Sequence, residues 1–247
     1  MIVLKLGGSV ITAKDRAETL DGEALDRAAD AIADARDGSG DEDLVIVHGG
    51  GSFGHHHASE HGVTTTEGTR DADAVLDIHG AMKTLNQFVL SRLAARDVDA
   101  VPVHPFSAAR RNSDGDLHLT TEQVETMLAE GFVPVLHGDV VAHAGAGATV
   151  VSGDELVAAL ARDLAADRVG LCSTVPGVLD ERDAVIGRIT DFESVADVLG
   201  ASDATDVTGG MAGKVRTLLD LEPAASIFGL DDLGAFLGGE NPGTTIE

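Results

Sequence analysis

The chain has 247 residues, 43% of them hydrophobic, which suffices for one large α/β domain or two small ones with a substantial core. The formal net charge is −25, from 42 acidic and 17 basic side chains. This balance argues against a nucleic-acid binder, which needs basic side chains to neutralise phosphates. No apolar run predicts a membrane-spanning helix, the N-terminus does not resemble a signal peptide, and a single cysteine excludes an internal disulfide framework. A cytoplasmic protein is expected.

Short apolar runs alternate with helical patterns along the whole chain. In chain order, the expected elements are strand 2–6, helix 25–36, strand 44–47, a long helix over 75–93, strand 100–103, helix 122–129, strand 133–136, helix 155–166, strand 169–172, helix 211–221 and strand 225–228. Hairpin or loop turns are expected at 112–115 and 144–147. This alternation predicts a largely parallel sheet covered by helices on both faces, with right-handed crossovers.

The acidic composition resembles that of proteins from salt-loving microbes, and lysine is scarce within it. The chain has only Lys5, Lys14, Lys83 and Lys214, against thirteen arginines. We expect such a chain to retain lysine where a compact ammonium group is chemically required. Three of the four lysines lie beside glycine-rich or strand-end motifs, which makes them candidates for a site.

The first motif is Lys5-Leu-Gly-Gly-Ser9, directly after the first predicted strand. Ligands of open α/β sheets bind beyond the carboxyl ends of the strands, where glycines let backbone N–H groups approach phosphate oxygens. The plain alternative is a strand–turn junction with an exposed lysine.

The second motif is His48-Gly-Gly-Gly-Ser-Phe-Gly-His55, after the second predicted strand. It matches the dinucleotide-binding glycine pattern, but that interpretation needs an acidic residue at the end of the next strand, and the candidates fall at or in the long helix. A phosphate cradle at a helix N-terminus remains, with His55, nearest the glycine loop, as a donor to an anionic oxygen. Three consecutive histidines diverge by roughly 100° per residue on a helix, so we expect His56 and His57 to be surface or packing residues rather than metal ligands.

Two further motifs precede helices in the second half. Thr208-Gly-Gly-Met-Ala-Gly-Lys214 departs from the P-loop pattern at both Thr208 and Val215, which leaves a glycine loop with an ammonium one turn into the helix. In Ser152-Gly-Asp154-Glu155, Ser152 or Asp154 could simply cap the helix. The functional alternative is a carboxylate that orients two lysines.

Taken together, these motifs resemble the archaeal isopentenyl phosphate kinases of the amino acid kinase superfamily. The resemblance spans nearly the whole chain, and its matching segments are 5–14, 48–55, 134–139, 152–154 and 206–214. Phe53-Gly54-His55 is typical of this branch and of the related fosfomycin kinases. The resemblance implies a three-layer αβα sandwich with a mainly parallel central sheet, as a single domain over 1–247. It further implies an acceptor-binding lobe to about residue 150 and a nucleotide-binding lobe from about residue 151.

The implied reaction is transfer of the ATP γ-phosphoryl group, with Mg²⁺, to isopentenyl phosphate in the alternative mevalonate route, by a homodimer. Carried onto this chain, the catalytic residues are Lys5, Lys14, Asp154 and Lys214. The implied acceptor-binding residues are Gly50, His55 and Gly153. The implied ATP-binding residues are Lys5, Gly7, Gly8, Ser9, Gly51, Thr174, Gly177, Gly210 and Lys214. No residue is expected to ligate a metal directly, and Pro176 departs from the acidic residue that many members carry before Gly177.

Three alternatives remain open on the sequence. A carboxylate or carbamate kinase would have less use for His55, and a fosfomycin-type kinase would need no apolar pocket for a substrate tail. A nucleotide-binding sensor without transfer activity is the alternative from outside the enzymes. The combination of Lys5, Asp154 and Lys214 argues against the sensor.

Overall fold

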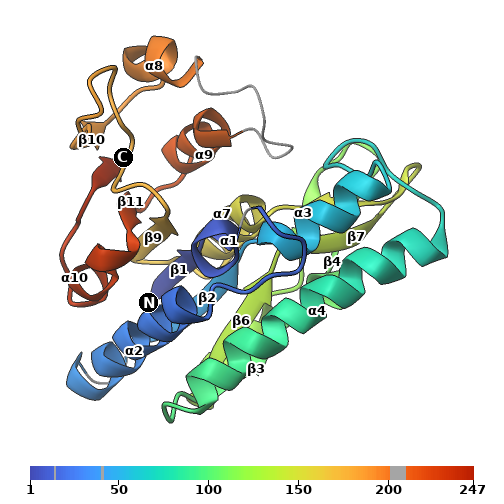
Figure 1. The fold of residues 1–247 in the computed structure, drawn as a ribbon, viewed down its shortest axis with the longest axis horizontal. Helices are drawn as coiled ribbons and strands as arrows, with labels where there is room; N and C mark the ends of the chain where they lie inside the picture. Colours follow the sequence, from blue (N-terminus) through green and yellow to red (C-terminus); the bar gives the residue numbers. More distant parts are fainter. Residues whose placement is uncertain (14, 40–41, 201–209) are drawn as a thin grey trace.

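The computed structural model describes residues 1–13, 15–39, 42–200 and 210–247 (Figure 1). Within them, the central sheet has eight strands in the order β10-β12-β11-β9-β1-β2-β6-β3. Their bounds are β1 (Ile2–Leu6), β2 (Leu44–His48), β3 (Ala100–Pro102), β6 (Val133–His137), β9 (Arg168–Ser173), β10 (Arg188–Ile189), β11 (Ala225–Gly229) and β12 (Thr244–Ile246). Every recorded pairing in this sheet is parallel except that of β11 with β12.

Helices cover both faces of this sheet. Alternate residues of β1 point to opposite sides: Leu4 packs in a core with α2 (Gly22–Ser39), α4 (Ala72–Ala94) and α10 (Leu233–Leu237). Val3 packs in a second core with α6 (Glu122–Ala129), α7 (Gly153–Asp163) and α9 (Gly210–Leu219). The predicted αβα sandwich with a mainly parallel sheet is confirmed. Lys5 shares the strand face of Val3, so its side chain emerges on the α7 side.

A smaller sheet continues beyond the carboxyl end of β6, and the sequence did not predict it. Its order is β5-β4-β7-β8, with bounds β4 (Ala109–Arg111), β5 (Leu117–Leu119), β7 (Asp139–His143) and β8 (Gly147–Val151). The turns predicted at 112–115 and 144–147 are the connections of its two antiparallel pairs. These strands have three to five residues, too few to give a clear alternation of apolar and polar side chains.

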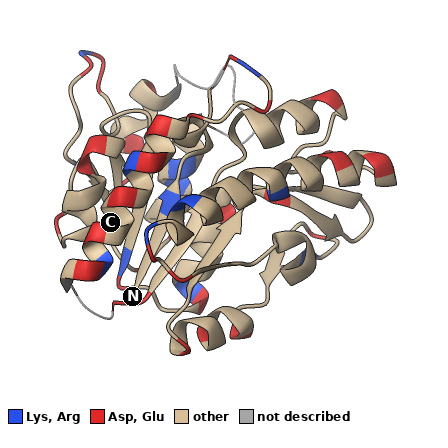
Figure 2. Cartoon of the chain, turned by 60° about the horizontal axis from the view of Figure 1, so that its bottom comes forward, with Lys and Arg blue, Asp and Glu red and all other residues tan. Residues whose placement is uncertain are grey.

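The remaining described elements are short helices around the two sheets. They are α1 (Gly8–Ile11), α3 (Gly51–Glu60), α5 (Pro105–Ala108), η1 (Glu193–Val195), α8 (Ala196–Gly200) and η2 (Leu230–Asp232). Of the described helices, none combines the length and apolarity that crossing a bilayer requires. Acidic side chains are distributed over the outer helices (Figure 2).

Candidate active site

The candidate site is a cavity at the carboxyl ends of β1, β2 and β6. The first glycine after each of these strands donates its N–H to a carbonyl group of the neighbouring strand in the sheet. Gly7 donates to Cys172 O (2.9 Å), Gly49 to Leu6 O (3.0 Å) and Gly138 to His48 O (3.0 Å). The sheet ladder therefore runs one residue past the strands before the backbone turns away. Gly7, Gly49 and Gly138 all line the cavity.

The first two glycine loops touch each other. A Cβ on Gly8 would lie 2.2 Å from Gly51 N, and Gly51 has a φ of +50°, so both positions require glycine. Thr12 fixes the junction, because its hydroxyl donates to Gly8 O (2.8 Å) and accepts from the Ser52 N–H (2.9 Å). Sequence reasoning did not find Thr12, whose partner lies forty residues away.

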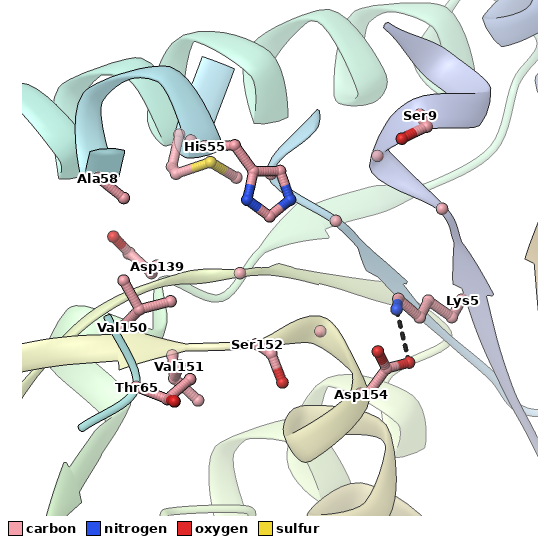
Figure 3. Close-up of a pocket in the computed structure, with 18 of the residues that line it drawn as sticks. Lys5, Ser9, His55, Ala58, Thr65, Asp139, Val150, Val151, Ser152 and Asp154 are labelled. Carbon is pink, nitrogen blue, oxygen red and sulfur yellow. Dashed lines mark hydrogen bonds and ion pairs between the residues drawn. The ribbon is translucent and has the colours of Figure 1, made fainter. Parts of the chain in front are cut away.

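Lys5, Asp154 and Lys214 come together at one end of the cavity. Lys5 Nζ donates to Asp154 Oδ1 at 2.6 Å (Figure 3), whereas Lys214 Nζ lies 3.8 Å from Asp154 Oδ2 and 3.3 Å from Gly210 O. The Lys5 side chain is 8% exposed and that of Lys214 22%. One carboxylate therefore faces two ammonium groups, one held closely and one loosely.

The first turn of α7, which carries Asp154, is held in place by contacts on the side away from the cavity. The Ser152 hydroxyl accepts from the Glu155 N–H (3.2 Å) and the Glu155 carboxylate accepts from the Ser152 N–H (2.9 Å), a capping box at the start of α7. Arg111 of β4, 5% exposed at its side chain, donates to Glu155 Oε1 at 2.6 Å. Ser152 is thus the cap, and Asp154 points into the cavity. The Ser-x-x-Glu spacing signals the box, but nothing in the sequence signals Arg111.

His55 lies in the wall opposite Ser152 (Figure 3). The sequence placed it at a helix N-terminus, but α3 begins at Gly51, so His55 is the fifth residue of the helix. Helical side chains lean toward the N-terminus, and this still brings the ring to the cavity. As predicted, His56 is a surface residue with a ring 48% exposed, while His57 pairs with Glu18 at 2.9 Å.

Beyond His55 the cavity wall becomes apolar. Its lining there includes Ala58, Val63, Ile78, Met82 and Val150. Met82 packs closely on the glycine loop, since a Cβ on Gly54 would lie 2.6 Å from its sulfur. The cavity is therefore cationic at one end and apolar at the other.

The other predicted site residues divide into three groups. Gly8, Ser9, Gly50, Gly153 and Thr174 line the cavity. Gly51, Gly177 and Gly210 are not among its lining residues. Gly51 borders a shallower depression, a Cβ on Gly177 would lie 2.7 Å from Thr244 Oγ1, and Gly210 begins α9. Lys14, with Thr208 of the third motif, lies outside the described residues.

One buried acid at this cavity was not singled out from the sequence. Asp139, 2% exposed, follows Gly138 and accepts from His79 Nδ1 at 2.9 Å. Burial raises the pKa of Asp139, and the hydrogen bond from His79 opposes that rise. Asp154 faces Lys5 and Lys214, whereas Asp139 faces His79, so the two carboxylates lie in different surroundings.

Comparisons with known proteins agree with this geometry. The family model described as the amino acid kinase family matches residues 1–224. An isopentenyl phosphate kinase of Haloferax volcanii is 60% identical over 246 residues, covering 100% of this chain and 98% of that protein. The isopentenyl phosphate kinase of Methanothermobacter thermautotrophicus is 38% identical, covering 89% of this chain and 86% of that protein. A solved isopentenyl phosphate kinase matches at 31% identity with a TM-score of 0.85, covering 100% of both chains.

The fold is that of the solved kinase, and the family model covers most of the chain. The chain belongs to the amino acid kinase family and, within it, to the isopentenyl phosphate kinases.

Proposed function

We propose that this protein transfers the γ-phosphoryl group of ATP to isopentenyl phosphate, which gives isopentenyl diphosphate and ADP. The observation that carries the proposal is a single cavity with Lys5, Asp154 and Lys214 at one end and apolar side chains at the other. A phosphate monoester with a short hydrocarbon tail has the same division of character. The 60% identity to a relative named for this activity supports the same substrate.

Phosphoryl transfer requires in-line positioning and neutralisation of charge more than covalent chemistry by the protein. An oxygen of the acceptor phosphate forms a bond to the γ-phosphorus, while the bond from that phosphorus to the β–γ bridging oxygen breaks. The acceptor oxygen is already ionised, so the step needs no general base. Lys5 and Lys214 neutralise the charge that accumulates on the transferring group. Asp154 is a positioning residue for both lysines.

His55 gives the acceptor its place in this scheme. A ring N–H can donate to a phosphate oxygen whether the imidazole is neutral or charged. Gly50 and Gly153 line the same part of the cavity and add close backbone approach. The hydrocarbon tail would then extend along Met82 and Ile78.

ATP, which a kinase of this family requires, would place its phosphates against Gly7, Gly8 and Ser9. Among the described residues, no group of three or more His, Cys, Asp or Glu side chains could hold a metal ion. Asp154 is already engaged by Lys5. Mg²⁺ would therefore arrive on the nucleotide phosphates and water, as it commonly does, and supply further charge neutralisation there.

We further propose that residues to about 150 bind the acceptor and residues from about 151 bind the nucleotide. The division is supported by the apolar cavity wall, which comes from residues before Val151, and by Thr174 and Lys214, which come after it. Gly153 and Asp154 lie at the boundary. The homodimer implied by the resemblance and the cytoplasmic location expected from the composition stay predictions, and light scattering at high salt tests the first.

An assay of ADP release against a panel of acceptors tests the proposed function. The panel contains isopentenyl phosphate, fosfomycin, acetylglutamate and carbamate. We expect isopentenyl phosphate to give the highest kcat/KM by a wide margin. Turnover of a carboxylate or carbamate at a comparable kcat/KM would refute the assignment, and absence of turnover with every acceptor would favour the nucleotide sensor.

A further inference from the structure

Two histidines occupy matched positions beneath the cavity. His48 ends β2 and His137 ends β6, and the two residues are partners in the register of these parallel strands. Both are 0% exposed, and their rings stack with centroids 5.5 Å apart. Each is followed by a glycine that lines the cavity, Gly49 and Gly138. Neither ring is among the lining residues, so neither is placed to touch a substrate.

Each ring contacts the carbonyl group of the glycine that follows it. His48 Nδ1 lies 3.1 Å from Gly49 O, and His137 Nδ1 lies 2.9 Å from Gly138 O. A carbonyl oxygen only accepts hydrogen bonds, so both Nδ1 atoms must carry the proton. Burial lowers the pKa of His48 to about 4 and that of His137 well below its ordinary value, so both rings are neutral near pH 7. Their Nε2 atoms must then accept.

The residues around the two rings fit this requirement. His104 Nδ1 lies 2.9 Å from His137 Nε2 and donates to it. The atom placed 3.1 Å from His48 Nε2 is Asn86 Oδ1, while the buried Asn86 Nδ2 has no recorded partner among the described residues. Hydrogen-bond partners decide which end of an amide is nitrogen, and here they require Asn86 to donate from Nδ2. The remaining titratable neighbours are Asp139, whose Oδ2 lies 3.8 Å from His137 Nδ1, and His79, which donates to Asp139, with Lys83 further out beside His104.

The consequence for the cavity follows from peptide geometry. In a trans peptide the N–H points opposite to the C=O. Turning Gly49 O inward to His48 therefore turns the Gly50 N–H outward, toward the cavity that Gly50 lines. The Gly50 N–H donates none of the hydrogen bonds recorded among the described residues. Gly138 borders the same space, since a Cβ on it would lie 3.8 Å from Gly50 N and 3.7 Å from Gly153 N.

We propose that His48 is a positioning residue for the acceptor, which orients the Gly49–Gly50 peptide so that the Gly50 N–H faces the acceptor phosphate, and that the stacked His137 ring keeps His48 in place. The inference rests on the proposed function for the identity of that acceptor. The geometry of the two rings stands without it. His48 acts through the Gly49–Gly50 peptide, and the phosphate contacts the Gly50 N–H.

The protonation state of the two rings tests the inference in the unaltered protein. Neutral histidine in water favours a proton on Nε2, whereas both buried rings must carry it on Nδ1. Long-range ¹⁵N–¹H spectra of the protein at neutral pH distinguish the two tautomers, and resonances are assigned with His48→Asn and His137→Asn. We expect Nδ1–H for both residues. An Nε2–H tautomer or a charged ring at His48 would overturn the inference.

Paired substitutions test the effect on the acceptor. Asn places an amide nitrogen near the position of Nδ1, whereas Gln reaches the position of Nε2. His48→Asn thus keeps the bond to Gly49 O, and His48→Gln keeps only the contact with Asn86. We expect His48→Gln to raise the KM for isopentenyl phosphate by about 10- to 100-fold while the KM for ATP stays unchanged, because small misplacements of positioning groups have costs of this order. The Asn variant should recover most of the loss, and the exposed His118→Gln should match the unaltered protein.

The outcomes separate this inference from the proposed function. Gln and Asn variants with equal acceptor KM values, or with equal increases in both KM values, would show a purely structural role and overturn it. If a Gln variant does not fold, the tautomer measurement decides the inference by itself. A protein with Nδ1–H tautomers that phosphorylates no isopentenyl phosphate would refute the proposed function and leave the orientation of the Gly49–Gly50 peptide intact.

Discussion

Lys5 and Lys214 share one carboxylate but are held differently. Lys5 lies 2.6 Å from Asp154 on a rigid buried strand, whereas Lys214 is 3.8 Å away on α9. Both ammonium groups can reach a phosphoryl group between the glycine loops. We expect Lys5→Ala and Lys214→Ala each to lower kcat by about 10²–10³, the usual cost of removing a donor that acts in the transition state. The KM for ATP should change far less, as measured by steady-state kinetics of ADP release.

Lys83 provides the matched control for these two variants. It is the described lysine outside the cavity and lies exposed on α4. Lys83→Ala should leave kcat unchanged. A kcat within twofold of the unaltered protein for Lys5→Ala or Lys214→Ala would remove that lysine from the catalytic role.

His55 is the residue on which the choice of acceptor depends. A phosphate dianion offers more charge to its ring N–H than a carboxylate does, and a charge-assisted hydrogen bond is the stronger kind. We expect His55→Ala to raise the KM for isopentenyl phosphate strongly and to leave the KM for ATP nearly unchanged. His55→Gln, which keeps a donor of similar reach, should recover part of the loss. The neighbouring His56→Ala serves as the control, and unchanged acceptor kinetics in His55→Ala would count against a phosphomonoester acceptor.

At the scale of single residues, the sequence predicted the site residues that are unusual in this chain or stand in a distinctive motif. Lysines in a lysine-poor chain and a histidine after a glycine loop are of this kind. It did not predict Thr12 or Arg111, because a threonine after a short helix and an arginine in a short strand have many ordinary uses. Their functions depend on partners forty or more residues away, Ser52 and Glu155.

The start of α7 connects the small sheet to the site. Glu155 directly follows Asp154, completes the capping box and accepts from Arg111. We expect Glu155→Ala to lower the free energy of unfolding by about 1–2 kcal/mol, the range for losing a helix cap. It should also lower kcat, because the first turn of α7 becomes less rigid and Asp154 no longer holds the two lysines in place. Urea unfolding and steady-state kinetics, both at constant high salt, measure the two effects.

Glu125 in the first turn of α6 is the matched control, since it is exposed and has no ion pair among those recorded for the described residues. Glu125→Ala should change neither quantity by much. Equal unfolding free energies and equal kcat values in the two variants would show that the capping box does not position Asp154.

Helix α4 supplies the apolar wall of the cavity. The apolar stripe on this helix makes Ile78, Met82 and Leu85 candidate wall residues, and the alternative is that the stripe packs only in the core. Ile78 and Met82 do line the cavity, but Leu85 is 0% exposed and belongs to the core beneath β1 and α2. Leu85 lies one turn further along the helix from Met82, past the end of the cavity. Nothing in the apolar pattern of α4 distinguishes the residues that line the cavity from those that pack in the core.

This difference between core and wall gives a test. We expect Met82→Ala and Ile78→Ala to lower the KM for longer isoprenoid monophosphates, because each removes bulk from the cavity wall. Leu85→Ala should leave the preference for chain length unchanged and lose about 2–5 kcal/mol of unfolding free energy, as buried leucines do. Kinetics with phosphates of increasing chain length, together with urea unfolding, measure both. If all three variants only lose stability, α4 does not border the tail.

Among the elements, the sequence predicted best those that are buried on both faces. The parallel strands and the helices that cover them appear as continuous apolar runs and helical stripes, and they lie within a few residues of their predicted bounds. The strands of the small sheet escaped prediction because their side chains divide between two environments over three to five residues. Their turns were visible because glycine and asparagine mark turns independently of the strands.

At the scale of the whole molecule, carboxylates greatly outnumber basic side chains, whereas the cavity has two lysines at one end. The net charge is −25, and acidic side chains are spread over the outer helices (Figure 2). Some are matched by arginines, as where Arg96 contacts both Asp26 and Asp30 of α2. Most of the excess has no positive partner, so the folded state carries repulsion that unfolding relieves. Low screening in dilute buffer strengthens this repulsion, since the Debye length falls from about 10 Å at 0.1 M salt to about 3 Å at 1 M.

We therefore expect the melting temperature to rise steeply with KCl concentration. A variant with fewer carboxylates tests whether repulsion between them is the cause. Asp34, Glu130 and Asp163 are exposed and make no recorded ion pair among the described residues. Changing all three to their amides removes three negative charges at nearly constant shape, so the variant should reach a given melting temperature at lower KCl than the unaltered protein. The two should converge at salt concentrations high enough to screen both. Sucrose, which favours compact states without screening charge, should shift both proteins equally. A melting temperature independent of KCl, or a salt dependence identical in the two proteins, would show that carboxylate repulsion does not limit the stability of this fold.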